Sequence, residues 1–307
     1  MSCNGAPAAP RAYRAVFFDL DGTLLPMEVD DFMTRYFTAL GGFIAARGLD
    51  VQAFTAGLKS GIKAMALHGP EITNEQAFFQ EFFRHADQSA ADWDRLLAEF
   101  YGGPFGQVGD GVVPDPAAAR AVDALAAKGY PLVLATMPMF PRAAVEWRLR
   151  WAGVDPSRFA RITTFDNSTS VKPKLPYFAE NLAAAGVRGS DVLMVGNNTV
   201  EDLAILDAGA DAFLVTDHLI DAEGYDLSTV KHGSLAAFAA WVDQLPACAQ
   251  PADTIEPGAV DGEAAQRAYE ANVVLRRTDE EAMRVAARAY PGAGQHVADA
   301  SNATERG

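Results

Sequence analysis

Cysteine is nearly absent from this sequence, and its histidines are scattered. The 307 residues include only two cysteines, Cys3 and Cys248, which lie near opposite ends of the chain and lack metal-ligand spacing. We therefore expect two free thiols, as suits a reducing compartment. The five histidines show no pairing at metal-binding spacing, so the sequence does not indicate a histidine-based metal site.

Long hydrophobic runs and clusters of basic residues are also lacking. No apolar run approaches the roughly 18 residues that a membrane span needs, and the N-terminus has no apolar segment of the secretory type. We therefore expect a cytoplasmic protein without a membrane partner. The net charge of −15, without lysine and arginine clusters, argues against a nucleic-acid partner. A small phosphorylated substrate remains compatible, because its site needs only local positive charge. The sequence does not fix the oligomeric state.

What is present is the composition of a globular protein with unusual ends. Half of the residues are hydrophobic and 21% are charged, and the length suits one or two domains. Residues 1–13 are rich in alanine and proline, and we expect them to be disordered. Residues 249–307 form an acidic, alanine-rich extension that we expect to be partly helical, near residues 263–290, and otherwise disordered.

Residues 27–103 show helical periodicity and no convincing strand. Apolar and aromatic side chains recur there at the spacing of one helix face, which predicts about four helices with a shared core. Two of these helices begin with capping-box patterns, Thr73 with Gln76 and Ser89 with Asp92. We therefore expect an all-helical domain inserted after the first strand.

The segments 14–26 and 104–248 alternate short apolar strands with helices. Strands are expected over residues 16–18, 132–136, 162–165, 192–196 and 212–215, and helices over residues 115–128, 141–151, 176–185, 201–208 and 234–241. Repeated βα units of this length predict a parallel sheet covered by helices on both faces. The predicted fold class is therefore α/β, a doubly wound parallel sheet with the helical insert above its active edge.

The first strand and the residues after it are the most informative stretch. The apolar residues 16–18 are followed by Asp19 and Asp21, one residue apart, and then by Gly22 and Thr23. Ligands bind at the carboxyl ends of strands in an open α/β sheet. Two carboxylates there repel each other, so their surroundings must hold a cation, a proton or both. The pattern indicates phosphoryl transfer, with Asp19 as nucleophile, bound Mg²⁺, and Asp21 as general acid and then base. A plain polar turn is the alternative.

Three later strand ends carry groups suited to the same chemistry. The hydroxyl of Thr136 is suited to phosphate oxygens, and Lys172 supplies positive charge to the phosphate and to Asp19. Residues 196–202 offer several oxygen donors for a hard cation. Each feature alone is also compatible with a strand end, a solvated lysine or a turn. Because four successive strand ends all carry groups suited to one reaction, the catalytic interpretation is favoured.

With these motifs, residues 15–216 resemble the haloacid dehalogenase superfamily, in its phosphatase branch with a type 1 helical cap. The resemblance implies a Rossmann-like core, Asp19 as the nucleophile that forms an aspartyl-phosphate, and Asp21 as the acid/base. Thr136 and Lys172 would match the second and third motifs. The inserted helices would close over a small-molecule substrate. Members that cleave carbon–halogen bonds lack the second acid, so Asp21 favours phosphate ester hydrolysis.

The resemblance also implies which residues bind phosphate and metal. The phosphate group would contact Asp19, Gly22, Thr23, Thr136, Met137 and Lys172. The Mg²⁺ ligands would be Asp19, Asp21 through its backbone carbonyl, Asn198 and Asp202.

Two positions depart from the pattern of the subgroup that the chain resembles. Asn198 stands where an acid normally ligates Mg²⁺ directly, and a neutral amide oxygen is a weaker ligand. Metal affinity should therefore fall unless Glu201 or Asp202 compensates. Met137 stands where that subgroup tends to carry asparagine, in the phosphate-binding loop.

The sequence therefore predicts a Mg²⁺-dependent phosphatase that acts on a small phosphorylated metabolite. Two alternatives remain open. One is a catalytically impaired protein of the same fold that binds a ligand or a partner. The other is a phosphomutase, which uses the same residues and differs in how the cap excludes water. The identity of the substrate is not encoded in these motifs.

Overall fold

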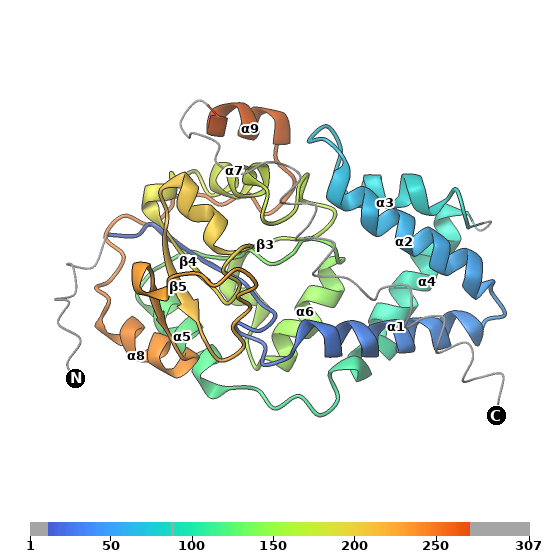
Figure 1. Cartoon of the computed structure of the whole chain (residues 1–307), viewed down its shortest axis with the longest axis horizontal. Coiled ribbons are helices and arrows are strands. Elements are labelled where there is room, and N and C mark those ends of the chain that lie inside the picture. The colour runs from blue at the N-terminus through green and yellow to red at the C-terminus, as the bar shows by residue number, and fades with distance from the viewer. Residues whose placement is uncertain (1–11, 87–88, 271–307) are drawn as a thin grey trace.

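A parallel sheet of six strands forms the centre of the protein. The computed structural model describes residues 12–86 and 89–270. The strand order is β3-β2-β1-β4-β5-β6, and every pair is parallel (Figure 1). The strands are β1 (Ala15–Phe18), β2 (Leu132–Leu134), β3 (Phe159–Ile162), β4 (Val192–Gly196), β5 (Asp211–Val215) and β6 (Lys231–Gly233). The predicted α/β class with a parallel sheet is confirmed.

Both faces of the sheet are buried. On β1, Val16 and Phe18 belong to one apolar cluster, Ala15 and Phe17 belong to another, and all four are fully buried. The first face is covered by the helices α5 (Pro116–Ala127), α6 (Arg142–Trp151) and α8 (Leu235–Gln244), and the second by α7 (Leu175–Ala184) and the short 3₁₀ helix η4 (Leu203–Ala208). Burial on both sides explains why β1 reads as an unbroken apolar run.

The order of the strands reverses beside β1. The chain runs outward from β1 through β2 and β3, and then crosses to the other side of β1 to form β4. Phe18 therefore has a parallel neighbour on each side, Leu134 on β2 and Val195 on β4. A ligand crevice forms at such a reversal, outside the carboxyl ends of the strands. Asp19, the residue after β1, lies at this position.

Among the described residues, four α-helices lie between β1 and α5, as the periodicity predicts, and the 3₁₀ helix η1 (Pro104–Gly109) follows them. The four α-helices are α1 (Val29–Ala45), α2 (Val51–Leu67), α3 (Asn74–Phe82) and α4 (Ala90–Gly102), gathered to one side of the sheet (Figure 1). Thr73 and Gln76 form the predicted capping box. Phe32 of α1 packs against Phe140 with ring centroids 5.6 Å apart, and Phe79 of α3 lies 6.3 Å from Phe165. The helical insert therefore contacts the loops that follow β2 and β3.

Apart from short 3₁₀ helices and shifts of a few residues at the ends of elements, three elements differ from the sequence-based expectation. Strand β3 begins at Phe159, because the buried Arg161 belongs to the strand and interrupts its apolar pattern. The expected helix 201–208 is shorter and of 3₁₀ type, because the residues before it form turns around the Asp202 carboxylate. Strand β6 was not predicted, because Lys231 and His232 are exposed and give no apolar signal.

The C-terminal extension packs on the core as far as residue 270. The guanidinium of Arg161 donates hydrogen bonds to the carbonyl oxygens of Glu256 and Gly258, at 2.8 and 2.5 Å. Helix α9 (Gly262–Glu270) then packs on α7, above it in Figure 1. The predicted helix near 263–290 is thus present in its first part, and the rest lies outside the described residues.

Two further expectations concern the ends of the chain and the membrane. Within residues 12–86 and 89–270, no helix has the length and apolar character that spanning a bilayer requires. Cys248 is a free thiol, as expected, whereas Cys3 and residues 1–11 lie outside the part that the structure describes.

Candidate active site

Asp19 lies in the crevice beside β4. Its backbone N–H donates to the Val195 carbonyl at 2.8 Å, which extends the pairing with β4 by one residue. Its nearly buried carboxylate accepts hydrogen bonds from Lys172 Nζ at 2.8 Å and from Thr23 Oγ1 at 3.2 Å. The structure thus brings three of the predicted phosphate-binding residues into direct contact.

Lys172 joins two carboxylates inside the protein. The residue is fully buried, and its Nζ atom also donates to Asp202 Oδ1 at 2.6 Å. Burial alone would lower the pKa of Lys172, but the carboxylates of Asp19 and Asp202 together raise it well above its ordinary value. The side chain is therefore a fixed positive charge beside Asp19.

Asp202 is held from both sides. Its Oδ2 atom accepts the backbone N–H groups of Asn197 and Asn198, both at 2.9 Å, while Oδ1 accepts from Lys172. A Cβ atom on Gly196 would lie 2.2 Å from Oδ2, so only glycine fits there. In this arrangement Asp202 positions Lys172, and both of its oxygens are already hydrogen-bonded.

The turn after β1 is fitted closely to the loop after β4. Thr23 Oγ1 lies 3.1 Å from Asn197 Oδ1 as well as near Asp19. Gly22 has φ +76°, and a Cβ atom there would lie 2.2 Å from Asn197 Nδ2. Glycine is therefore needed at position 22 for both its backbone conformation and its small size.

Thr136 presents an unused hydroxyl at the end of β2. Its Oγ1 atom is buried and has no hydrogen-bond partner, whereas its carbonyl accepts from Thr163 and Tyr177. Thr136 and Met137 line the same pocket of about 370 Å³ as Asp19. A buried hydroxyl without a partner is costly, so the structure favours a ligand acceptor at this point.

Asp21 forms an ion pair that the sequence did not indicate. Arg148 Nη1, on α6, donates to Asp21 Oδ2 at 2.5 Å, and the Arg148 side chain is only 2% exposed. The guanidinium also lies over the rings of Phe140 and Phe32, at 4.7 and 5.3 Å from their centroids. Burial raises the pKa of Asp21 and the charge of Asp19 adds to the rise, while Arg148 opposes it.

Arg148 is the main site residue that sequence reasoning missed. A signal was available in α6, because Arg148 follows Ala144 and Val145 by four and three residues, and all three are buried on one helix face. A charged residue on an apolar helix face is seldom buried without a partner. That spacing would have marked Arg148 as a buried cation facing an acid elsewhere in the chain.

Glu201 brings a further carboxyl group to the pocket. Its Oε1 atom is buried without a hydrogen-bond partner, and burial raises the pKa of Glu201 to about 8, with Lys172 opposing the rise. The Asn198 side chain lines the same pocket, but its Oδ1 atom accepts the backbone N–H groups of Val200 and Glu201. Asp202 does not line it.

The donor chemistry fits a hard cation such as Mg²⁺. Two buried carboxyl oxygens, Asp21 Oδ1 and Glu201 Oε1, have no partner and belong to residues of the same pocket as Asp19. Carboxylate oxygens are the usual protein ligands of Mg²⁺. These carboxyl groups do not yet form a complete metal site. In the described ranges, no group of three or more aspartate, glutamate, histidine or cysteine residues has metal-binding geometry.

The site thus combines a doubly wound parallel sheet, paired aspartates after its first strand and a buried lysine on the first of them. The haloacid dehalogenase-like hydrolase family model matches residues 13–210. The chain belongs to this family of hydrolases.

Solved structures to which the chain is similar carry the names of both phosphatases and dehalogenases. A 2-haloacid dehalogenase from Pseudomonas syringae pv. Tomato DC3000 is similar at TM-score 0.51 and 16% identity, over 76% of this chain and 99% of that chain. A predicted phosphoglycolate phosphatase from Haemophilus somnus 129pt gives 0.46 and 16%, over 75% and 98%. CbbY from Rhodobacter sphaeroides in complex with phosphate gives 0.45 and 18%, over 73% and 95%. No curated protein matches the sequence.

Proposed function

We propose that this hydrolase is a Mg²⁺-dependent phosphatase that cleaves a small phosphorylated metabolite through an aspartyl-phosphate. The second acid carries the proposal, because Asp21 lies two residues after Asp19 and lines the same pocket. Phosphate ester hydrolysis needs a proton for the leaving oxygen and then a base for water, and one carboxyl group can serve both steps. In carbon–halogen cleavage the leaving group departs as a halide anion and needs no proton, so that reaction does not require an acid at position 21.

In the first step, a carboxylate oxygen of Asp19 attacks phosphorus and the bond to the leaving oxygen breaks. The carboxyl proton of Asp21 moves to that oxygen, so that a neutral alcohol leaves. Burial, which raises the pKa of Asp21, favours the protonated form that this step requires. The product is a phosphoryl group bonded to Asp19.

In the second step, the ionised Asp21 removes a proton from water as the water oxygen attacks phosphorus. The bond between phosphorus and the Asp19 oxygen breaks, and inorganic phosphate leaves. Asp21 is then protonated again and Asp19 is an ionised carboxylate, as at the start. Asp19 therefore acts only as the nucleophile, while Asp21 is the acid in the first step and the base in the second.

Lys172 and Thr136 would hold the phosphoryl oxygens in both steps. The ammonium group has three donors, of which Asp19 and Asp202 use two, so one remains for a phosphoryl oxygen. The Thr136 hydroxyl supplies a second donor without losing a protein partner. Donors fixed in advance stabilise developing charge without reorganisation.

Asp19, the Asp21 carbonyl and Glu201 would hold Mg²⁺, and Glu201 would supply the acid that is missing at Asn198, whose Oδ1 atom could join them only by giving up its two backbone N–H groups. When bound, the cation would neutralise the negative charge of the phosphoryl group and of Asp19. Asp202 could act as the fourth predicted ligand only by giving up one of its present hydrogen bonds. We therefore assign Asp202 chiefly to positioning Lys172.

One observation favours the alternative of a catalytically impaired binding protein. The side-chain oxygen of Asn198 is occupied by two backbone N–H groups, which leaves its position without a free metal ligand. In that case the fold would bind a phosphorylated ligand and not cleave it.

Turnover of p-nitrophenyl phosphate with and without Mg²⁺ tests the proposal. The unaltered protein should turn over and bind Mg²⁺ by calorimetry, Asp19→Asn should have no activity, and Asp21→Asn should retain a residual activity that is about 10²- to 10⁴-fold lower. Asn198→Asp should tighten Mg²⁺ binding. If only Asn198→Asp binds the metal and turns over, the impaired binding protein is correct; full activity in Asp19→Asn would exclude the aspartyl-phosphate.

A further inference from the structure

A cavity of about 690 Å³ lies between the helical insert and the core. It is separate from the pocket around Asp19, but Met33 and Phe140 line both spaces. The two spaces therefore adjoin at these two side chains, and a group bonded to a phosphate at Asp19 would reach the cavity by passing them. Its volume is within the range of about 300–1,000 Å³ that small-molecule sites occupy.

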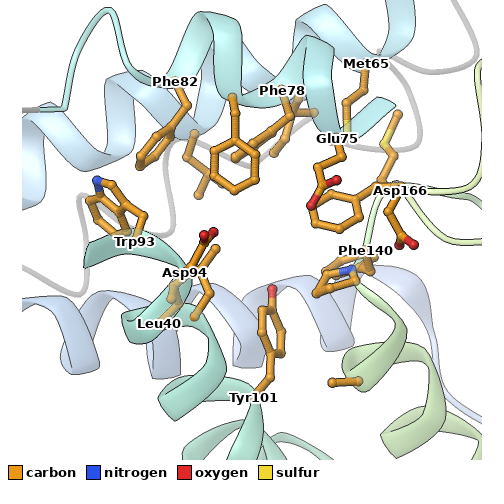
Figure 2. Close-up of a pocket in the computed structure, with 18 of the residues that line it drawn as sticks. Leu40, Met65, Glu75, Phe78, Phe82, Trp93, Asp94, Tyr101, Phe140 and Asp166 are labelled. Atoms are coloured by element: carbon orange, nitrogen blue, oxygen red, sulfur yellow. The ribbon is translucent and has the colours of Figure 1, made fainter. Parts of the chain in front are cut away.

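Aromatic side chains form a large part of the cavity wall, and most of the remaining lining residues are apolar. The rings of Phe78, Phe82, Trp93 and Tyr101 surround the space, and Phe140 closes the side toward the core (Figure 2). Many of these rings also pack edge to face; Phe82 and Trp93, for example, have centroids 4.8 Å apart. The packing holds the wall in place, so the space suits an apolar or aromatic body.

Three carboxyl groups also line this apolar space: Glu75, Asp94 and Asp166. In Figure 2, the Glu75 and Asp94 carboxylates point toward the space between the rings, and Asp166 lies beside Glu75. Burial raises the pKa of Glu75, and the charges of Asp166 and Asp94 raise it further. Among the described residues, no lysine, arginine or histidine forms an ion pair with any of the three.

The three acids lie near one another although they do not share a helix. Glu75 lies in the first turn of α3, where the helix dipole stabilises a negative charge. Asp94 belongs to α4 and Asp166 to the loop after β3, so the three acids come from separate elements. Asp94 and Asp166 are exposed and Glu75 is partly buried, so the three acids lie at the open side of the cavity, whose aromatic faces attract cations as well.

We propose that this cavity binds the leaving group of the substrate, and that this group is an apolar or aromatic body carrying a protonated or quaternary amine. The proposal rests on the phosphatase function proposed above and narrows its substrate to phosphate monoesters of hydrophobic amino alcohols. The phosphate lies at Asp19, the apolar body lies among the rings, and the cation lies near Glu75.

Binding of 2-(1-naphthyl)ethylamine and its neutral analogue 2-(1-naphthyl)ethanol, measured by calorimetry, tests the inference without turnover. The amine should bind about tenfold more tightly at low salt, and the preference should shrink at high salt. Glu75→Gln should reduce the preference at least about threefold. Glu71→Gln, which removes an exposed acid outside the cavity, should leave it unchanged. Equal binding of amine and alcohol would overturn the cationic assignment.

Two further measurements connect the cavity with the active site. Ala98 is exposed at the cavity rim, so Ala98→Trp should fill the space without unfolding the chain and abolish binding of both ligands. The amine should inhibit p-nitrophenyl phosphate hydrolysis competitively. Binding that persists in Ala98→Trp, or that does not compete, would overturn the leaving-group assignment. Selective amine binding by a protein without phosphatase activity would contradict the proposed function and leave the cation selectivity standing.

Discussion

Arg148 donates a hydrogen bond to Asp21 over 2.5 Å, although the two residues are 127 positions apart in the chain. The pair places the permanent positive charge of Arg148 beside the Asp21 carboxyl group, which must act first as an acid and then as a base. Burial and Asp19 raise the pKa of Asp21, and Arg148 lowers it. The balance of these opposing effects sets the pH at which Asp21 can give up its proton.

Replacing Arg148 by methionine should shift the pH profile of catalysis upward. Without the guanidinium, the pKa of Asp21 rises further, so Asp21 stays protonated to higher pH. The alkaline limb of kcat/KM, which reports loss of the acid, should therefore move to higher pH. Phenyl phosphate is the suitable substrate, because its poor leaving group depends on the proton from Asp21.

Arg148→Lys is the matched control for this change. It keeps a positive charge but loses the planar group that lies over Phe140. We expect its pH profile to stay closer to that of the unaltered protein. An unchanged alkaline limb in Arg148→Met, with a protein that still folds, would show that Arg148 does not control Asp21.

Gly196→Ala should weaken catalysis through Lys172. The new methyl carbon would stand only 2.2 Å from Asp202 Oδ2 and would displace Asp202, which holds Lys172 beside Asp19. We expect kcat to fall by at least about tenfold, together with a lower unfolding temperature.

Gly42→Ala is the control, because a Cβ atom there meets nothing within 4 Å on the exposed side of α1. It should stabilise the helix by about 0.5–1 kcal/mol and leave kcat unchanged.

Glu180→Gln should remove part of the pH dependence of stability. Burial raises the pKa of Glu180 to about 7. The folded state therefore binds its proton more tightly than the unfolded state, and this contribution is complete below the unfolded pKa and is lost as pH rises through about 7. In urea titrations, we compare the free energy of unfolding of Glu180→Gln with that of the unaltered protein at each pH. This difference should change by about 1–3 kcal/mol in favour of Glu180→Gln between pH 5 and pH 8.

Glu71→Gln serves as the control in the same titrations, since that side chain is exposed in the turn before α3. Its difference from the unaltered protein should be the same at both pH values. A constant difference for Glu180→Gln as well would mean that Glu180 is ionised in the folded protein throughout this range.

Removing the C-terminal extension should destabilise the core. Truncation after residue 248 removes the carbonyl groups of Glu256 and Gly258, which accept hydrogen bonds from the fully buried Arg161. A buried cation that loses acceptors costs several kcal/mol, so we expect a loss of about 3 kcal/mol or more. Truncation after residue 270 keeps both carbonyl groups and should unfold at a higher denaturant concentration. Coincident unfolding curves for the two truncations would exclude a stabilising role for residues 249–270.

The fold could be predicted because its signals are local. Short apolar strands alternate with helices, and Asp19 follows a strand that is buried on both faces. Periodicity also predicted the four inserted helices and the Thr73 cap. The short edge strand β6 escaped this reasoning, because an exposed edge needs no apolar side chains.

The sequence by itself determined that this protein is a hydrolase-type α/β fold whose first strand delivers Asp19 and Asp21 to the sheet edge. Each of those features depends on residues close together in the chain. The sequence also predicted Lys172 beside Asp19. Only the tertiary structure decided the other contacts: Arg148 on Asp21, Asp202 as the second partner of Lys172, and a cavity with aromatic and acidic groups beyond Phe140. Such contacts arise when distant segments dock, and no local pattern records the distance between them.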